Sequence, residues 1–426
     1  MYDWANSAYV TTVSVGLLGP YLLNVVIPDS GVVLFGTEFG ASSLFPLAVG
    51  VSAAIVFLIA PVLGAIADFS GVKKRFLLFF AYMGALATIP LYFSGTGDVL
   101  ITLLLFIVAQ TAFVAANVFY DAFLPNIASA EDMDRVSGKG YAYGYVGGGL
   151  QFAMSLLLVV GYAQVGITQE HAVQIAMATA GVWWAGFTLF TLRYLKETRT
   201  ETPLPDAYRR MGSVFGYLAI GFSRTIQTTR KVGRYRHLVL FLVAFMLYND
   251  GIQTVLSVAN LYGADELGLG YGALLGTLLM IQFVAIGGAL FFSWLADRIG
   301  TKQAVMLTLI VWSVAVSYAY FIETATEFFI LGGIIGVVLG GSQALSRSFY
   351  GSMIPAEASA EFYGFYSVFS KFSAIWGPFV FFFINQLTGS SRNAIVSLII
   401  FFVLGLVLLY FVDEDKARLA GNESAF

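Results

Sequence analysis

Ionisable and amide side chains lie inside long apolar stretches of this sequence, where no water is available to solvate them. Asn249, Asp250 and Gln253 interrupt the apolar stretch 237–262, and Lys371 interrupts the stretch 361–386. A charged side chain at the centre of a bilayer costs on the order of 3 kcal/mol on insertion scales, so such residues are typical of sites that bind a solute, an ion or a proton. Asp250 is the leading candidate for proton or cation coupling. A structural ion pair between Asp250 and Lys371 is the simpler alternative.

Polar residues in four of the apolar stretches fall on one face each when the chain is wound at about 100° per residue. Lipid cannot satisfy polar groups, so these faces are predicted to line a central substrate cavity. The candidate cavity residues are Asn6, Gln110, Asn117, Asn249, Asp250, Gln253 and Gln343. The alternative is that they form interhelical hydrogen bonds, worth about 0.6 kcal/mol each.

Asp3 and Asp121 lie nearer the predicted cytoplasmic ends of their stretches. They belong to the candidate coupling or ion-pair residues together with Asp250 and Lys371, or they act as gate or cap residues that contact Arg135 or Lys139. Arg347 also lies near the predicted inner face, where snorkelling of its side chain to water is a sufficient explanation.

The elements that position these residues are predicted to be membrane-spanning helices. Of the 426 residues, 58% are hydrophobic and 11% are charged, and the apolar stretches exceed the roughly 20 residues that a helix needs to cross a bilayer. We expect no cleavable signal peptide before the first stretch. The predicted fold is all-α and integral to the membrane, with twelve transmembrane helices at about 4–27, 45–67, 76–94, 97–122, 139–162, 171–195, 237–262, 270–296, 304–322, 326–349, 361–386 and 391–412.

The charge distribution predicts that both termini are cytoplasmic. In this topology Arg392 is the only one of the 22 Lys and Arg residues on the outer side. The predicted domains are an N-terminal six-helix half at 1–195, a basic cytoplasmic linker at 196–236 and a C-terminal six-helix half at 237–426. The linker is predicted to contain an amphipathic helix on the inner membrane surface, or to be a plain basic tether.

A repeat links the two halves. "GAIADFSGVKKR" at 64–75 matches "SWLADRIGTKQ" at 293–303, with one shared offset along the chain. An aspartate at the C-terminal end of its own helix opposes that helix's dipole, so it is expected to face another helix N-terminus or a basic partner. The glycines supply a tight turn and the cations keep the loop inside. The residues of this inter-helix loop motif are Asp68, Gly71, Lys73, Asp297, Arg298, Gly300 and Lys302.

Glycines at four-residue spacing are predicted to let helices approach closely. They occur at Gly140, Gly144 and Gly148 and again in the stretch 326–349 at Gly332, Gly336 and Gly340. The pair Gly377-Pro378 is predicted to bend the eleventh helix.

With its two copies of this loop and its twelve spans, the chain resembles the major facilitator superfamily. "YDWANSAY" at 2–9, "GYVGGGLQF" at 144–152, "NDGIQTVLSVANLYGADELGL" at 249–269 and "GGSQALSRSFYGSMIP" at 340–355 resemble its vacuole-effluxer-like branch. This resemblance implies two six-helix halves, alternating access, and a cavity lined by helices one, four, seven and ten. It also implies amino-acid cargo, since fungal members are associated with amino-acid release from the vacuole. Phe69 departs from the arginine usual in the superfamily, so the first loop is expected to be latched differently.

The sequence lacks the signatures of other function classes. It contains no cysteine and no phosphate-binding G-x-x-x-x-G-K-[ST] loop, and both histidines fall at predicted helix ends. We therefore expect no enzyme activity, no cofactor and no metal, and transport driven by a gradient.

The predicted function is secondary active transport of a small polar metabolite, most favourably an amino acid, by alternating access with proton coupling. A multidrug or lipophilic-cation exporter, with an aromatic-lined cavity, and a non-transporting membrane receptor are the alternatives. The expected partners are a small-molecule substrate, the lipid bilayer and a proton or cation gradient, with no nucleic acid. The protein is expected to be a monomer in the plasma (inner) membrane of a bacterium.

Overall fold

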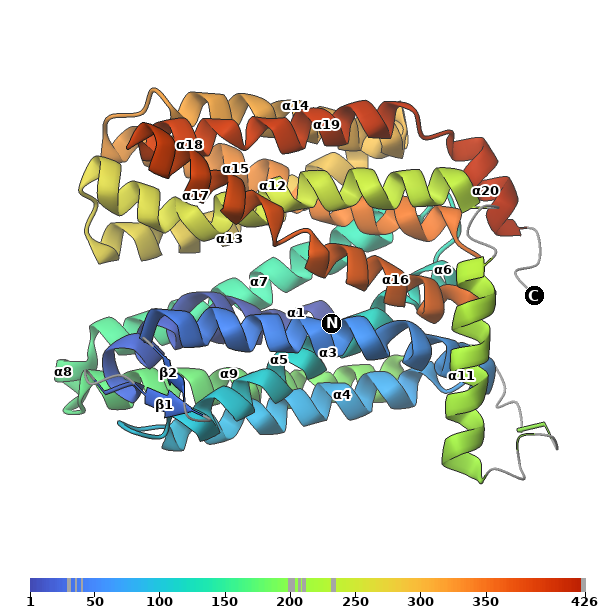
Figure 1. Cartoon of the computed structure of the whole chain (residues 1–426), viewed down its shortest axis with the longest axis horizontal. Coiled ribbons are helices and arrows are strands. Elements are labelled where there is room, and N and C mark those ends of the chain that lie inside the picture. Colours follow the sequence, from blue (N-terminus) through green and yellow to red (C-terminus); the bar gives the residue numbers. More distant parts are fainter. Residues whose placement is uncertain are drawn as a thin grey trace. The chain divides into compact units, whose positions relative to one another are not determined.

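The computed structural model describes residues 1–28, 32–34, 37–39, 41–197, 204–205, 208, 212–230 and 235–422. Among these residues, 12 helices are long and apolar enough to cross a membrane, which confirms the predicted twelve-helix fold (Figure 1). Parts of the predicted linker, at 198–203, 206–207, 209–211 and 231–234, lie outside the described residues. Contacts along the chain divide it into two compact units that do not coincide with the predicted domains, which stay a prediction.

The first unit comprises Met1–Ile59, Val72–Tyr120 and Tyr143–Arg199. It is built from helices, with one short antiparallel hairpin in which Val32 pairs with Phe39. Helices α3, α5 and α7 extend beyond it. Its elements are α1 (Tyr2–Ala8), η1 (Tyr9–Leu17), α2 (Leu18–Tyr21), η2 (Leu22–Val26), β1 (Val32–Leu34), β2 (Thr37–Phe39), α3 (Ala41–Ser70), α4 (Lys73–Thr88), η3 (Ile89–Phe93), α5 (Val99–Asp121), α7 (Met133–Val160), α8 (Tyr162–Val165) and α9 (Gln169–Tyr194).

The first span is not a regular α-helix. The segments η1 and η2 are π-helical and flank the single turn of α2, which contains Pro20. Proline has no N–H to bond the carbonyl of Gly16, one turn earlier, so the regular α-helical ladder is interrupted at this point.

Helix α1 packs closely against α7 through glycines, as predicted for Gly144 and Gly148. A Cβ atom on Gly148 would lie 3.0 Å from the Ser7 carbonyl oxygen, and one on Gly144 would lie 2.9 Å from the Ser7 hydroxyl. Larger side chains would push the two helices apart. The glycine stripe therefore holds the polar face of the first span in place.

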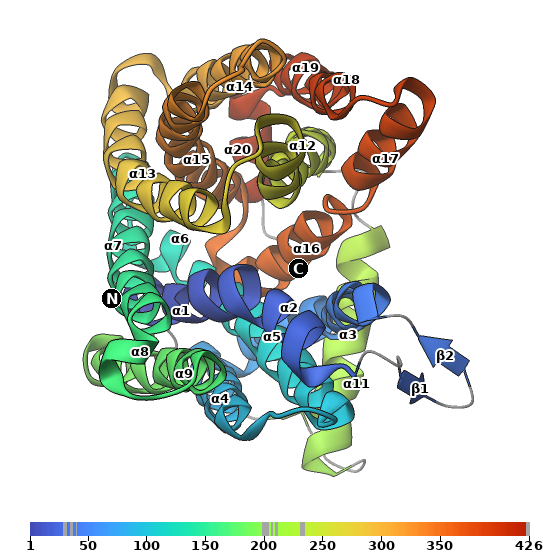
Figure 2. The ribbon, with the colours of Figure 1, turned by 90° about the vertical axis from the view of Figure 1, so that its left-hand side faces the viewer.

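The second unit comprises Ala60–Gly71, Asp121–Ala142 and Thr200–Phe426. Figure 2 views its helices along their length, with α12 between α15 and α17. In addition to the ends of α3 and α7, its elements are α6 (Leu124–Ile127), α11 (Ser213–Arg230), α12 (Arg236–Leu267), α13 (Tyr271–Ile299), α14 (Thr301–Ala319), α15 (Ala325–Met353), η5 (Ala356–Ala358), α16 (Ser359–Phe372), α17 (Trp376–Thr388), α18 (Ser391–Ser397), α19 (Ile399–Tyr410) and α20 (Glu414–Asn422).

The predicted glycine contact of α15 is confirmed, and its partner is α13. A Cβ atom on Gly336 would lie 3.1 Å from the Ile281 carbonyl oxygen, and one on Gly340 would collide with the carbonyl oxygen of Ala285. The backbones of these two helices therefore touch along several turns.

The eleventh span is broken rather than merely bent. Helix α16 ends at Phe372 and α17 begins at Trp376. Pro378 cannot donate to the carbonyl of Ala374, and its ring would clash with that carbonyl in a continuous helix, so the chain leaves the helical path just before the proline. The predicted disturbance at Gly377-Pro378 is confirmed, and it is stronger than a bend.

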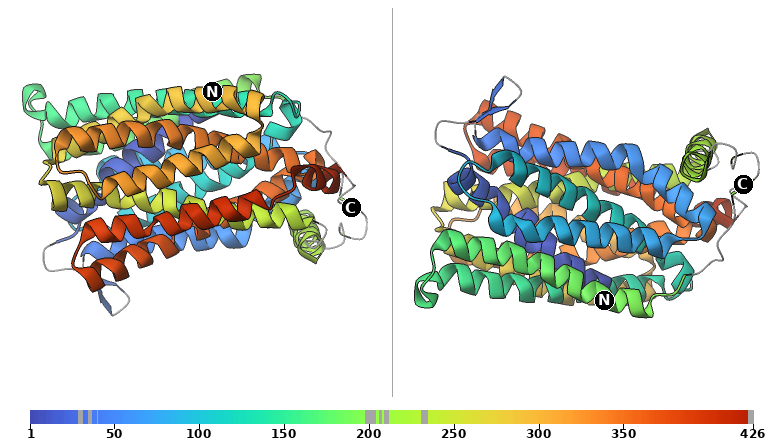
Figure 3. Two further views of the ribbon diagram at one scale, coloured as in Figure 1. Left: turned by 90° about the horizontal axis from the view of Figure 1, so that it is seen from above. Right: turned by 90° about the horizontal axis from the view of Figure 1, so that it is seen from below.

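Helix α11 confirms the predicted helix in the linker. It runs past the end of α16 (Figure 1), and the right-hand view of Figure 3 shows it close to end-on. Gly221 packs against Val62 and Ile66 of α3. Phe215 and Phe222 of the same helix are exposed, so α11 has one packed face and one free apolar face.

Candidate functional site

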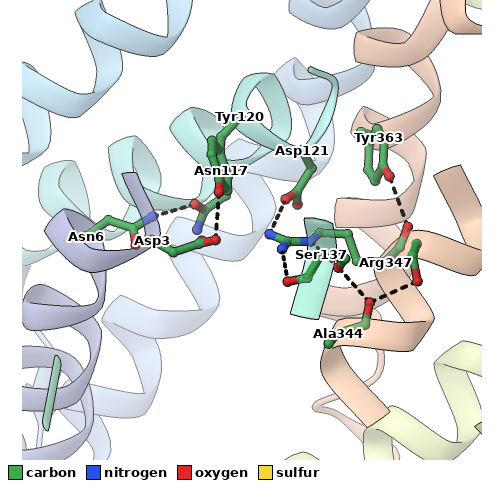
Figure 4. A network of polar contacts seen from close by, with 10 residues as sticks. Asp3, Asn6, Asn117, Tyr120, Asp121, Ser137, Ala344, Arg347 and Tyr363 are labelled. Carbon is green, nitrogen blue, oxygen red and sulfur yellow. Dashed lines mark hydrogen bonds and ion pairs between the residues drawn. The ribbon is translucent and has the colours of Figure 1, made fainter. Parts of the chain in front are cut away.

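The polar faces of the first and fourth spans contact each other. Asn6 on α1 donates to the Asn117 side-chain oxygen on α5 at 2.6 Å, and the Tyr120 hydroxyl donates to the Asp3 carboxylate at 2.7 Å (Figure 4). Asp3 and Asn6 are buried. These residues therefore share an interhelical hydrogen-bond network, which was the alternative to a cavity lining.

Gln110 is buried at a second contact between the same two spans. The Tyr9 hydroxyl donates to its side-chain oxygen at 3.1 Å, and the Ser14 hydroxyl does so at 3.3 Å. Both donors come from the π-helical η1. The amide nitrogen of Gln110 makes no hydrogen bond among the described residues, so this side chain keeps donor capacity for a further group.

Arg347 does not snorkel to water, which corrects the prediction for this residue. It is 4% exposed and lies on α15, where its guanidinium pairs with the Asp121 carboxylate at 3.1 Å. It also donates to the Ser137 hydroxyl and carbonyl on α7 (Figure 4). Its guanidinium carbon lies 4.3 Å from the Tyr141 ring centroid. A planar guanidinium suits this combination of bidentate donation and stacking.

The predicted contact of Asp121 with Arg135 or Lys139 is wrong, because Asp121 pairs with Arg347, and the contact predicted for Asp3 stays a prediction. Arg135 pairs with Asp132, three residues before it, and Lys139 forms no ion pair within the described part of the chain. The Arg135 side chain is exposed, and Asp132 lies just before the first residue of α7, so neither belongs to the packed face of this helix. The packed face carries Ser137, which binds Arg347 instead.

Asp134 forms a second polar contact between α7, α14 and α15. The Thr301 hydroxyl on α14 donates to one carboxylate oxygen at 2.6 Å, and the Ser348 hydroxyl on α15 donates to the other. Together with the Arg347 network, this contact fastens the first turns of α7 to helices of the second unit.

Asp250 caps the second half of the broken eleventh span. It is 1% exposed, and its two carboxylate oxygens accept from the backbone N–H groups of Trp376 at 3.0 Å and Gly377 at 2.8 Å. The first N–H groups of a helix have no partner in their own helix, and its positive dipole end favours an anion. The carboxylate therefore satisfies the start of α17 inside the membrane-spanning region.

Asn249 contacts the segment between α16 and α17, where the eleventh span is broken. Its side-chain nitrogen donates to the Ser373 hydroxyl, and Gln253 donates back to the Asn249 side-chain oxygen at 3.5 Å. Asn249 is buried, whereas Gln253 is half-buried. Gln343, on α15, is also half-buried, so these two amides are the candidate cavity residues of this unit that solvent reaches.

The predicted ion pair between Asp250 and Lys371 is not formed. Lys371 is half-buried at the last turn of α16, and its side-chain ammonium makes no ion pair or hydrogen bond within the residues that the structure describes. Asp250 is occupied by the start of α17, just beyond the break. Lys371 is therefore a charged side chain beside the break that has no counterion among the described residues.

Asp68 of the first repeat loop contacts a helix N-terminus, as its position predicts. It is 2% exposed and accepts from the backbone N–H groups of Ala360 at 3.2 Å and Glu361 at 2.8 Å, in the first turn of α16. Gly64 makes this reach possible, because a Cβ atom there would collide with the Ala360 carbonyl. Both halves of the eleventh span therefore begin at a buried aspartate from another helix.

The second repeat loop makes different contacts. Asp297 is exposed and accepts no hydrogen bond among the described residues. The Arg298 guanidinium carbon lies 3.9 Å from the Trp294 ring centroid, and Lys302 donates to the carbonyls of Tyr410 and Val412. The expectation that this aspartate faces a helix N-terminus or a basic partner is wrong.

Two glycines give the loops the same backbone turn. Gly71 has φ 70° and Gly300 has φ 92°, values that side-chain-bearing residues rarely adopt. After the first turn comes Lys73, which is 1% exposed at the start of α4. The two copies of the loop motif therefore share a backbone turn that requires glycine.

Four residues of these networks were missed in the sequence. Ser137 and Asp134 lie in a loop-like polar stretch, and Ser373 resembles any small residue in an apolar span. Glu361 stands at the first position of the predicted eleventh span, and its burial is not predicted from the sequence. The available signal was the polar spacing of Asp134, Ser137 and Tyr141, which falls on one helical face.

Three carboxyl groups among the described residues outside the spans have shifted pKa values, those of Asp132, Asp413 and Glu414. Hydrogen bonds from Arg135 and Ser129 hold the pKa of Asp132 below its ordinary value. Burial raises the pKa of Glu414 on α20, and the Arg418 charge acts in the opposite direction. Arg418 also pairs directly with Glu414 at 2.5 Å.

The comparisons with known proteins agree with this architecture. The family model described as vacuole effluxer Atg22 like matches residues 2–422. The chain belongs to this Atg22-like family. It is 33% identical over 423 residues to the MFS-type transporter YxiO of Bacillus subtilis (strain 168), covering 98% of this chain and 94% of that protein.

Relatives of the Atg22-like chain include fungal proteins. Autophagy-related protein 22 of Coccidioides immitis (strain RS) is 25% identical over 473 residues, covering 93% of this chain and 77% of that protein. The chain is therefore a multi-pass membrane transporter of the major facilitator type, and its substrate is a small molecule.

Solved structures show the same fold. The outward conformation of FucP, a major facilitator superfamily transporter, has a TM-score of 0.67 at 13% identity, covering 97% of both chains. The proton:xylose symporter XylE also has a TM-score of 0.67 at 13% identity, covering 98% of this chain and 94% of that one. The Atg22-like chain thus has the major facilitator fold.

Proposed function

We propose that the protein is a secondary active transporter that exports a small solute bearing a carboxylate, most favourably an amino acid, by alternating access with proton coupling. One observation carries the proposal: the eleventh span is broken, and Lys371 lies beside the break without a counterion among the described residues. Transporter sites are often built on discontinuous helices, where the ends of half-helices and freed polar groups receive the solute.

The polar groups at the break favour a carboxylate ligand. Lys371 offers three N–H donors, and the half-buried Gln253 offers an amide within the same unit. Asp250 already binds two backbone N–H groups, so it is a poorer counterion for a solute ammonium than an unoccupied carboxylate would be. The charge left unsatisfied near the break is therefore positive.

The setting of the transporter is part of the proposal. We infer a monomer in the plasma membrane of a bacterium with both termini cytoplasmic. In this setting α11 lies along the inner membrane surface, with its exposed Phe215, Phe222 and Ile226 in contact with lipid. The charge asymmetry of the sequence supports this orientation.

The test is uptake and counterflow of labelled amino acids in proteoliposomes under an imposed pH gradient. Lys371→Met is expected to lower transport of a carboxylate-bearing amino acid by about tenfold to a hundredfold, since a charged hydrogen bond contributes about 1.5–3 kcal/mol. Lys416→Met is the matched control, because Lys416 is exposed on α20 and pairs with Asp413 three residues away. Equal losses in both variants would contradict the proposed site.

A lipophilic-cation exporter is the second candidate, favoured by one aromatic cluster. Tyr366 stacks with Phe245 at 4.4 Å between ring centroids and contacts Tyr350 and Tyr363. Transport of tetraphenylphosphonium instead of every amino acid in the panel would favour this candidate. If neither class moves nor raises the melting temperature, a non-transporting receptor replaces both.

A further inference from the structure

Glu361 is a buried carboxyl group that no step of the proposed transport cycle has used so far. It lies in the first turn of α16 with 0% of its surface exposed. Neither carboxylate oxygen has a hydrogen-bond partner among the described residues. Burying an ionised carboxylate without partners costs far more than burying the neutral acid.

The groups around Glu361 come from three other helices. Asp68 of α3 and Arg224 of α11 are the charged groups that act on it, and the Thr228 hydroxyl of α11 is the polar side chain that stabilises its ionised form. Tyr350 of α15 also interacts with it electrostatically. The balance is one carboxylate and one guanidinium, while the tyrosine hydroxyl donates elsewhere, to the Phe362 carbonyl.

Asp68 and Glu361 are not equivalent. Asp68 receives two backbone N–H groups at the positive end of α16, and one of them belongs to Glu361 itself. The Glu361 carboxylate oxygens receive no N–H group among the described residues. Two carboxyl groups that share a buried site do not both ionise readily, so the proton resides on the one without donors.

We propose that Glu361 is a proton-binding site that is occupied while Asp68 holds the first turn of α16 and is emptied when that turn moves away from Asp68. The inference rests on the proposed function in one respect, because the released proton is the one coupled to transport. In the separated state Asp68 no longer repels an ionised Glu361, which favours loss of its proton. Binding and release require only proton exchange with water at the α11 end of this unit.

The first experiment tests the proton directly and needs no substrate. The full chain in liposomes is titrated between pH 5 and 8, and the infrared C=O band of protonated carboxylic acids is recorded for the wild type, Glu361→Gln and Glu357→Gln. Glu357 is the matched control, because it is exposed four residues earlier. We expect a protonated band at pH 7 that Glu361→Gln removes and Glu357→Gln keeps. Identical bands in the wild type and Glu361→Gln would overturn the proposal.

The second experiment reads the movement of α16. The chain has no cysteine, so Ser359→Cys provides a single thiol at the buried start of this helix. The thiolate fraction of any cysteine rises with pH, so the labelling rate is divided by the rate of the same thiol in the Glu361→Gln background. This ratio is expected to rise with pH by up to about tenfold per pH unit, the slope for loss of one further proton. A rate that rises equally in both backgrounds would contradict the coupling of Glu361 to this movement.

Transport distinguishes this inference from the function on which it rests. If the wild type and Glu361→Gln accumulate an amino acid equally under the pH gradient, the proton site is overturned while the transport proposal stands. If no amino acid moves but the infrared band and the labelling behave as expected, the proton site stands and the substrate proposal fails.

Discussion

The two repeat loops have the same turn but fasten different groups. In the first loop the aspartate itself, Asp68, reaches across to the first turn of α16. In the second loop Asp297 is exposed, and the hydroxyl of Thr301 donates to a carboxylate on α7. The direction of the contact is therefore reversed: the first loop supplies the acceptor, and the second supplies the donor.

The opposing helix explains the reversal. Helix α7 carries Asp134 in its own first turn, where it complements the helix dipole. Helix α16 also has an acid in its first turn, Glu361, but its carboxylate oxygens make no hydrogen bond among the described residues, and the Ala360 and Glu361 N–H groups receive Asp68 instead. A duplicated loop sequence thus predicts a duplicated turn, while the contact depends on what the facing helix lacks.

The two loops also take the arginine that stacks on an aromatic ring from different parts of the chain. In the second loop Arg298 stacks on Trp294 of its own helix. In the first loop the arginine position is occupied by Phe69, and Arg224 of α11 lies over that ring at 5.6 Å. This difference in latching was predicted from Phe69, and it makes α11 part of the first loop only.

The largest expected effect comes from removing the first acceptor. Asp68→Ala should lower the free energy of unfolding by about 2–3 kcal/mol, because two N–H groups lose a charged, buried partner. Denaturation in detergent measures the loss, with Asp98→Ala, an exposed loop carboxylate, as the control. A loss no larger than that of the control would remove the basis of the comparison.

A smaller effect is expected for the acceptor of the second contact. Asp134→Ala should lower the same free energy by about 1–2 kcal/mol, since Ser348 retains carbonyl acceptors in its own helix. Ser348→Ala and the double variant complete a mutant cycle for this bond. Strict additivity in the cycle would mean that the two residues do not interact.

The two stacked arginines give the third prediction. Arg224→Gln and Arg298→Gln should each cost about 0.5–1 kcal/mol, the usual size of a cation–π contact near a surface. Only Arg224→Gln should also loosen α11, detected as faster proteolysis within 213–230. Equal proteolysis in both variants would show that the arginine over Phe69 does not hold this helix.

The smallest effect is expected for Asp297, the aspartate of the second repeat loop. Asp297→Ala should change the free energy of unfolding by less than about 0.5 kcal/mol, as for most exposed positions. Parallel unfolding of Asp68→Ala and Asp297→Ala is the direct comparison. Similar losses for the two would mean that the loops act alike in the bilayer.

Much of the fold followed from composition and periodicity. Twelve apolar stretches, the glycine stripes and the interruption near Pro378 require only local information, since each depends on residues within a few turns. Helix α11 in the linker could also be predicted, because its apolar residues recur at helical spacing.

Side-chain partners were less predictable, since they depend on which faces meet. Helical spacing placed Asn6 and Asn117 on polar faces correctly, but it could not tell that the faces bond to each other. Their opposite charges predict an ion pair between Asp250 and Lys371. The sequence does not show that the span is interrupted before Trp376, and the free N–H groups of Trp376 and Gly377 bind Asp250 instead.

The π-helical first span has a consequence for how related chains align. A π-helical turn accommodates one residue more than an α-helical turn. Deleting one residue within Tyr9–Leu17 would convert such a turn to an α-helix and leave the flanking segments in phase. Sequences that lack one residue in this stretch can therefore share the contacts of Asn6, and a one-residue deletion here should be tolerated better than one in the regular α-helix α5.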